Sequence, residues 1–168
     1  MSNSSLKVEA KGDREVVISR SFNASKELVF TAHTECKYLK RWMFGPEGWS
    51  LDVCEIDLTV GGKYRWVWKK ADKGIEMGMG GEYREIERPD RIVATEQFDD
   101  PWYEGEGLST VTFVESNGVT TLTNTMTYIS REARDQVLAS PMEEGLEMGY
   151  KRLESLLEET GHAAGSGE

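Results

Sequence analysis

Side chains alternate between apolar and polar over a long central stretch, and this period of two restricts residues 51–129 to a β-sheet. Gly-Gly at 61–62, Arg-Pro-Asp at 88–90 and Asn-Gly at 117–118 are typical turn sequences. Because these connections are short, consecutive strands are expected to run antiparallel. The predicted strands are 51–58, 62–70, 75–86, 91–98, 108–115 and 118–129.

One further strand and two short helices are expected ahead of this stretch. Residues 16–22 are rich in β-branched side chains and predict the strand. Ser25 is placed to cap a first short helix, and Thr34 is placed to cap a second one, over residues 35–43. The Gly and Pro residues at 45–48 end the second helix.

The C-terminal part of the chain predicts one long helix of about 20 residues. Ser140 is a suitable N-cap, Pro141 fits the first helical position, and Glu143 completes a capping box. Gly161 stands where a C-terminal cap is expected. Leucine and methionine side chains form one stripe along this helix, so one face is predicted to lie on the sheet.

These elements predict an α+β fold in which a curved antiparallel sheet of six to seven strands wraps a long C-terminal helix. The 168 residues contain no linker or internal repeat, so a single domain is expected over 14–160. The polar start, residues 1–13, and the Gly- and Ser-rich end, residues 161–168, are expected to be disordered.

The net charge of −10 argues against nucleic acid as a partner, because acidic surfaces repel phosphate backbones. No stretch is long and apolar enough to insert into a membrane, and no signal peptide is evident, so the cytoplasm is the expected location. Cys36 and Cys54 lack a CxxC spacing and are expected to be reduced thiols that pack as small apolar groups.

A ligand pocket is expected because the inner face of the sheet carries more apolar area than the helices can cover. Aromatic and methionine side chains there would suit a small hydrophobic molecule. Gly145 and Gly149 on the long helix either permit close backbone packing or leave room for a ligand. The predicted ligand-binding residues are Trp42, Phe44, Trp66, Trp68, Met77, Met79, Tyr83, Phe98, Trp102, Phe113, Asn124, Met126, Met142, Leu146 and Gly149.

Candidates for catalysis are few. Glu96, Asn124 and Tyr83 share the inner face, and an enclosed Glu96 would have a raised pKa suited to proton transfer. A strand-end position at the rim is the alternative for Glu96, and bonding within the protein is the alternative for Asn124. With only His33 and His162 in the chain, a nucleophilic triad or a zinc site is not expected, and neither is any cofactor.

The loop at 99–107 combines carboxylates with Trp102 and Tyr103. It could be a solvated loop, a metal site or a cover for the pocket; calcium-loop spacing is absent, and a mobile rim over the pocket mouth is favoured. The Gly-Met-Gly-Gly run at 78–81 predicts a bulge or a close approach within a strand.

Three segments resemble the START-like, helix-grip (SRPBCC) superfamily, and within it the bacterial homologues of the activator of the heat-shock chaperone ATPase. They are 57–64 (DLTVGGKY), 80–93 (GGEYREIERPDRIV) and 142–153 (MEEGLEMGYKRL), and Trp42 matches the family tryptophan that closes the second short helix. The resemblance implies a seven-stranded sheet around the C-terminal helix with a cavity between them. Because members range from lipid carriers to cyclases and chaperone-associated domains, it does not imply one activity.

Three functions follow as expectations. The first is binding of a small hydrophobic or aromatic molecule in the cavity, as a monomer or weak dimer. The second is a cyclase- or hydrolase-like enzyme that uses the same pocket. The third, from the resemblance alone, is an interaction domain whose partner is a chaperone.

Overall fold

The computed structural model describes residues 6–166, with side chains described to residue 160. Eight antiparallel strands form one sheet in the order β1-β2-β8-β7-β6-β5-β4-β3. The elements are β1 (Lys7–Lys11), β2 (Glu15–Phe22), α1 (Lys26–Thr34), α2 (Cys36–Trp42), β3 (Trp49–Ile56), β4 (Lys63–Lys70), β5 (Ile75–Glu87), β6 (Arg91–Phe98), β7 (Gly107–Ser116), β8 (Val119–Thr127), α3 (Arg131–Leu138) and α4 (Met142–Ser166).

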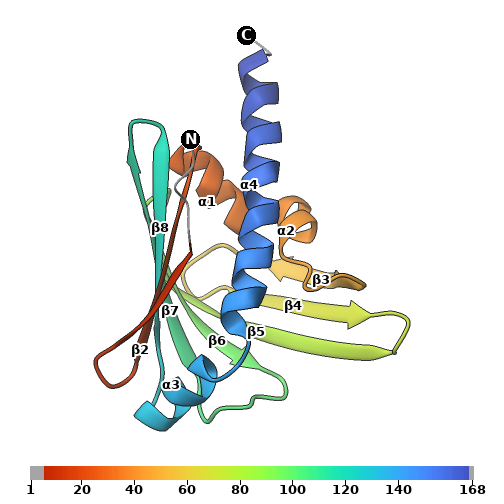
Figure 1. The fold of residues 1–168 in the computed structure, drawn as a ribbon, viewed down its shortest axis with the longest axis vertical. Coiled ribbons are helices and arrows are strands. Elements are labelled where there is room, and N and C mark those ends of the chain that lie inside the picture. The colour runs from red at the N-terminus through yellow and green to blue at the C-terminus, as the bar shows by residue number, and fades with distance from the viewer. Residues whose placement is uncertain (1–5, 167–168) are drawn as a thin grey trace.

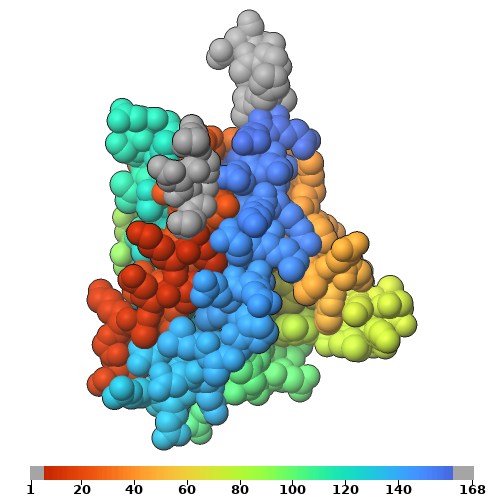
Figure 2. Space-filling model, in the orientation of Figure 1, coloured from red at the N-terminus to blue at the C-terminus, as the bar shows by residue number. Residues whose placement is uncertain are grey.

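The sheet curves, and the helices lie on its concave side (Figure 1). Strands β3, β4 and β5 splay away from the rest, so the β4–β5 turn projects from the body of the molecule (Figure 2). Strict alternation sets the inner face: in β2 every second residue is buried, and Val16 pairs with Met126 of β8. The predicted α+β helix-grip fold is confirmed, with eight strands instead of six or seven.

The hydrophobic core lies between the middle turns of α4, helices α1 and α2, and the inner face of the sheet, to which strands β2 to β8 all contribute. Phe22, Phe30 and Leu153 are almost completely buried there. The indole of Trp42 is central to it, because its N–H donates to the Ala32 carbonyl at 2.9 Å and its ring stacks on Tyr150. Among the described side chains, those of the middle turns of α4, from Tyr150 to Leu157, therefore hold the helix in place.

The chain ends are more ordered than the sequence suggested. The predicted disorder of residues 1–13 is wrong for residues 7–11, which form β1 and pair with β2. The C-terminal helix does not stop before Gly161 but reaches Ser166. The prediction for residues 1–5 and 167–168 lies outside the described residues.

Two capping predictions are also wrong. Thr34 does not cap the second helix; it ends α1 and its hydroxyl donates to the Phe30 carbonyl at 3.0 Å. Ser140 does not accept a bond at the start of α4, because its hydroxyl donates back to the Val137 carbonyl of α3. The Ser25 cap of α1 is confirmed, since its side chain accepts the amide N–H of Leu28.

Cys36 and Cys54 form a disulfide, with Cα atoms 5.8 Å apart, so the prediction that both are free thiols is wrong. The bond joins the first residue of α2 to the edge strand β3. Sequence spacing does not reveal this pairing, because it depends on how α2 packs against β3. In the part of the chain that the structure describes, no helix is long and apolar enough to cross a membrane.

Candidate functional site

The burial of α4 is uneven along the helix. Its middle turns bury Leu153, Leu156 and Leu157, whereas Met142 and Leu146 on the first turns are only half-buried. A Cβ added at Gly145 would meet no atom within 4 Å, so this glycine does not serve close packing. The inner face of β4, β5 and β6 therefore has an incomplete cover at the N-terminal end of α4.

Aromatic side chains form the wall of this uncovered region. Trp66, Trp68 and Phe98 point inward from β4 and β6, yet all three remain half-buried. The Trp66 and Trp68 rings lie 6.3 Å apart, edge to face, and Tyr64 lies 4.6 Å from Trp66. Such a wall offers flat apolar area and polarizable ring faces to a guest molecule.

Glu96 lies in this wall between two glycines. On one side it pairs with Gly107 of β7, and the register of β5 with β6 puts Gly81 on the other side. A Cβ at Gly81 would fall 1.9 Å from the Thr95 carbonyl oxygen, so a glycine is required there. The glycine run in β5 thus reflects close approach of neighbouring backbone and side-chain atoms.

The environment of Glu96 favours its neutral form. Burial raises the pKa of the Glu96 carboxyl to about 7. Burial also raises the pKa values of the Tyr64, Tyr103 and Tyr128 hydroxyls, and the negative charge of Glu96 raises them further. One carboxyl group therefore faces several tyrosine rings, an arrangement that is able to hold or move a proton near neutral pH.

Two polar atoms in this region have no hydrogen-bond partner among the described residues: the indole nitrogen of Trp66 and the hydroxyl of Tyr103. Both atoms are shielded from solvent. The neighbouring groups are satisfied, since the Trp68 N–H donates to the Met43 carbonyl and the Tyr64 hydroxyl donates to the Thr95 carbonyl. Buried donors without acceptors are uncommon in folded proteins, and a bound water or a ligand would supply the missing acceptor.

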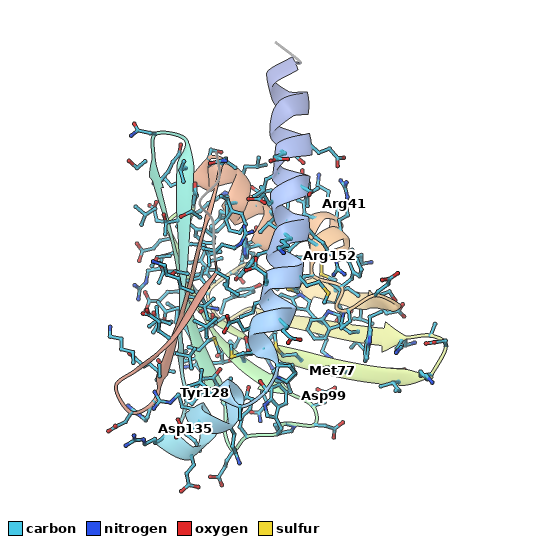
Figure 3. All side chains as sticks on the ribbon, viewed as in Figure 1. Arg41, Met77, Asp99, Tyr128, Asp135 and Arg152 are labelled. Carbon is cyan, nitrogen blue, oxygen red and sulfur yellow. A yellow bond between two sulfur atoms is a disulfide. The ribbon has the colours of Figure 1, made fainter. Side chains whose placement is uncertain are left out.

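The structure divides the predicted ligand-binding residues into three groups. Trp42, Phe113, Met126, Met79 and Tyr83 are buried, the first two deep in the core. Met77 and Trp102 are instead 43% and 44% exposed, and Figure 3 places Met77 near Asp99 at the rim. The third group is half-buried and consists of Trp66, Trp68, Phe98, Met142 and Leu146.

Three other predicted residues have local roles. Asn124 accepts the Ser109 hydroxyl at 2.9 Å, so its amide has a partner within the sheet. Phe44 lies under the guanidinium of Arg152. A Cβ added at Gly149 would lie at ordinary contact distance from Trp42, and one added at the exposed Gly145 would meet no atom, so neither glycine is required for close backbone packing.

His33 is a packing residue. Its Nδ1 lies 2.8 Å from the Val29 carbonyl, and its ring packs edge-on against Trp42 and Phe113. Burial lowers its pKa to about 4, so it is neutral at physiological pH. Among the residues that the structure describes, no three His, Cys, Asp or Glu side chains are grouped as metal ligands would be.

A family model described as "Activator of Hsp90 ATPase homolog 1-like protein" matches residues 23–158. The chain belongs to this family. The predicted resemblance to bacterial members of the START-like superfamily is thus confirmed. No curated protein matches the chain significantly.

Solved structures agree with this assignment. A Rhodobacter sphaeroides protein is 30% identical, with a TM-score of 0.85 over 90% of this chain and 97% of that one. The AHSA1 protein of Silicibacter pomeroyi is 21% identical, with a TM-score of 0.67 over 85% and 96%, which supports the fold alone. An HSP90 activator from Plasmodium falciparum is 27% identical, with a TM-score of 0.53 over 68% and 72%.

This AHSA1-like chain has two open pockets, and neither is lined by Trp66, Trp68 or Phe98. A groove of about 780 Å³ runs between β1, the end of α3 and the outer side of α4, past Val8, Leu138 and Met148. A hollow of about 400 Å³ lies between the β6–β7 loop and α3, beside Trp102 and Glu132. Neither is the enclosed cavity that the sequence predicted.

Sequence reasoning missed the burial of two polar residues of this AHSA1-like chain. Arg20 is buried on the inner face of β2, over the Phe22 ring, and its Nε lies 3.5 Å from Glu147 of α4. Arg20 is two residues from both Ile18 and Phe22, so strand alternation puts all three side chains on the same, inward face. Tyr103, predicted as a rim residue, is only 4% exposed and packs edge-on against Tyr128.

Proposed function

We propose that this AHSA1-like protein binds a small, largely apolar, aromatic molecule on the concave face of the sheet, beneath the first turns of α4. The incomplete cover of Trp66, Trp68 and Phe98 by α4 carries the proposal. Burying the remaining exposed area of these rings against a ligand would contribute about 25 cal/mol for each Å² removed from water. Trp66, Trp68, Phe98, Met142 and Leu146 are the residues expected to contact the ligand.

The experiment is a fluorescence titration with the neutral probe N-phenyl-1-naphthylamine. Wild-type protein should bind it, and Leu146→Glu should abolish binding, because the new carboxylate would stand over the apolar face. Met148→Glu is the matched control, since it makes the same charge change on an exposed position of the same helix. Met148 lines the outer groove. Loss of binding in Met148→Glu alone would move the site to that groove and contradict the proposal.

A second candidate function is association with a chaperone of the Hsp90 type. Family membership and the similarity to the Plasmodium falciparum HSP90 activator favour it. Affinity capture with the purified chaperone of the same organism would test it. Recovery of the chaperone by wild-type protein and by Leu146→Glu alike would show that this association does not use the concave face.

A further inference from the structure

The polar atoms of the concave face limit the kind of aromatic ligand that fits. Trp66 Nε1 donates only, and Tyr103 presents a hydroxyl that is also able to donate. Each is buried and lacks an acceptor in the described part of the chain. A buried donor left unsatisfied costs about 1–3 kcal/mol. A ligand that supplies an acceptor removes this cost, whereas a plain hydrocarbon keeps it.

Each donor belongs to a side chain packed among other aromatic rings of the concave face. The Trp66 ring lies 4.6 Å from that of Tyr64, and the Tyr103 ring lies 6.4 Å from that of Phe98. Tyr64 itself is occupied, because its hydroxyl donates to the Thr95 carbonyl at 2.6 Å. Tyr103 is fixed in place by edge-on packing against Trp102 and Tyr128. The free donors thus belong to a rigid aromatic cluster and not to side chains that turn toward solvent.

We propose that the concave site, if it binds aromatic molecules as argued above, takes one whose ring system carries a carbonyl oxygen. This oxygen would accept a hydrogen bond from Trp66 Nε1–H, from the Tyr103 hydroxyl, or from both. The apolar wall sets the affinity for the rings. The two donors set the preference for the oxygen. This makes Trp66 and Tyr103 specificity-determining residues.

The protonation state of Glu96 determines the pH at which binding should be measured. Its ionised carboxylate would repel an acceptor oxygen, and burial gives this group a pKa of about 7. Binding is therefore measured at pH 6, where Glu96 is mostly protonated. Tyr64, Tyr103, Tyr128 and Tyr150 are the other titratable groups that its charge affects, and all remain protonated at this pH.

The test compares 2-acetylnaphthalene with 2-ethylnaphthalene, which have the same carbon skeleton and differ in the carbonyl oxygen. Each displaces N-phenyl-1-naphthylamine in a competition titration. Wild-type protein should prefer the acetyl compound by roughly 3- to 10-fold, the value of one neutral hydrogen bond. Trp66→Phe or Tyr103→Phe should reduce that ratio toward one. Trp68→Phe is the matched control, because its indole N–H is already bonded to Met43 and the ratio should persist.

The outcomes separate the two proposals. Equal affinity of wild-type protein for both compounds overturns the carbonyl preference and leaves aromatic binding intact. A preference that survives unchanged in both Trp66→Phe and Tyr103→Phe overturns the assignment to these donors. If neither compound nor the probe binds, the proposed function itself is wrong, and this inference falls with it. Each variant is first checked by thermal unfolding, and two independent donors ensure that one unfolded variant does not decide the result.

Discussion

The guanidinium of Arg152 on α4 lies 3.9 Å from the centre of the Phe44 ring, and its Nη1 donates to the Gly45 carbonyl at 2.6 Å (Figure 3). One side chain thus joins α4 to the connection between α2 and β3. Gly45 has a φ of 90°, a conformation that glycine adopts without strain. The carbonyl that Arg152 reaches is therefore presented by a turn that other residues would disfavour.

Replacing Arg152 by alanine should lower the free energy of unfolding by about 1–3 kcal/mol, since it removes a charged hydrogen bond and a cation–π contact. Arg152→Lys should lose less, because the charge over Phe44 remains. Urea unfolding measures both. Equal stability of all three proteins would show that the contact contributes nothing.

Two leucines seven residues apart on α4 should respond differently to truncation. Leu153 is completely buried and Leu146 is only half-buried. Leu153→Ala should cost about 2–5 kcal/mol, as for other core leucines. Leu146→Ala should cost well under half of that. Similar losses in urea unfolding would mean that the first turns of α4 are packed as tightly as the later ones.

Glu96→Gln should change how stability depends on pH. The pKa of Glu96 is raised from 4.5 to about 7 in the folded protein, so the native state binds the extra proton between these values. Its contribution to stability is present below about pH 4.5 and is lost as the pH rises through 7. The glutamine variant should therefore be more stable than wild type at pH 8, by about 2–3 kcal/mol, and show no such gain at pH 4.5. Chemical unfolding at the two values measures this difference.

His33 should make the stability of the protein depend on pH in the opposite direction. Its pKa falls from 6.5 to about 4 on folding, so the unfolded state binds more protons between these values. Stability is full above pH 6.5 and declines as the pH falls toward 4, with a loss of about 2 kcal/mol by pH 5. His33→Gln should lack this decline. An NMR titration of the imidazole that gave a midpoint near 6.5 would contradict the prediction.

The Cys36–Cys54 disulfide joins two residues that are 18 positions apart in the sequence. Reduction, or replacement of both cysteines by serine, should lower the free energy of unfolding by about 2–4 kcal/mol. The cytoplasmic location of the protein stays a prediction, and a reducing cytoplasm would favour free thiols at both positions. Alkylation in fresh cell extract, followed by mass spectrometry, measures which form the cell holds. Two alkylated cysteines would show that the disulfide is absent in vivo.

The sequence predicted seven of the eight strands and the long helix, because alternation and turn residues there are strong and local. It did not predict β1, since Lys-Val-Glu-Ala-Lys has no buried face and the strand depends on pairing with β2. Helix α3 was also missed, although Ser130 is a recognisable N-cap that accepts the amide of Ala133.

Predictions for the site were less complete because they concern distant segments. Alternation put Trp66, Phe98 and Glu96 on the inner face, and the structure has them there. It could not show that Phe113 fills the core while Trp66 keeps an unsatisfied N–H, because both depend on where the helices stop covering the sheet. Tyr103 sits in an irregular loop, for which no periodicity predicts a direction.

The unequal burial along α4 has an evolutionary consequence. The turns around Leu153 maintain the fold, and the turns around Leu146 contribute little to it. Mutations at the exposed and half-buried positions of the first turns are therefore expected to cost little stability. Lineages with this architecture are able to change what they recognise without first acquiring compensating changes elsewhere.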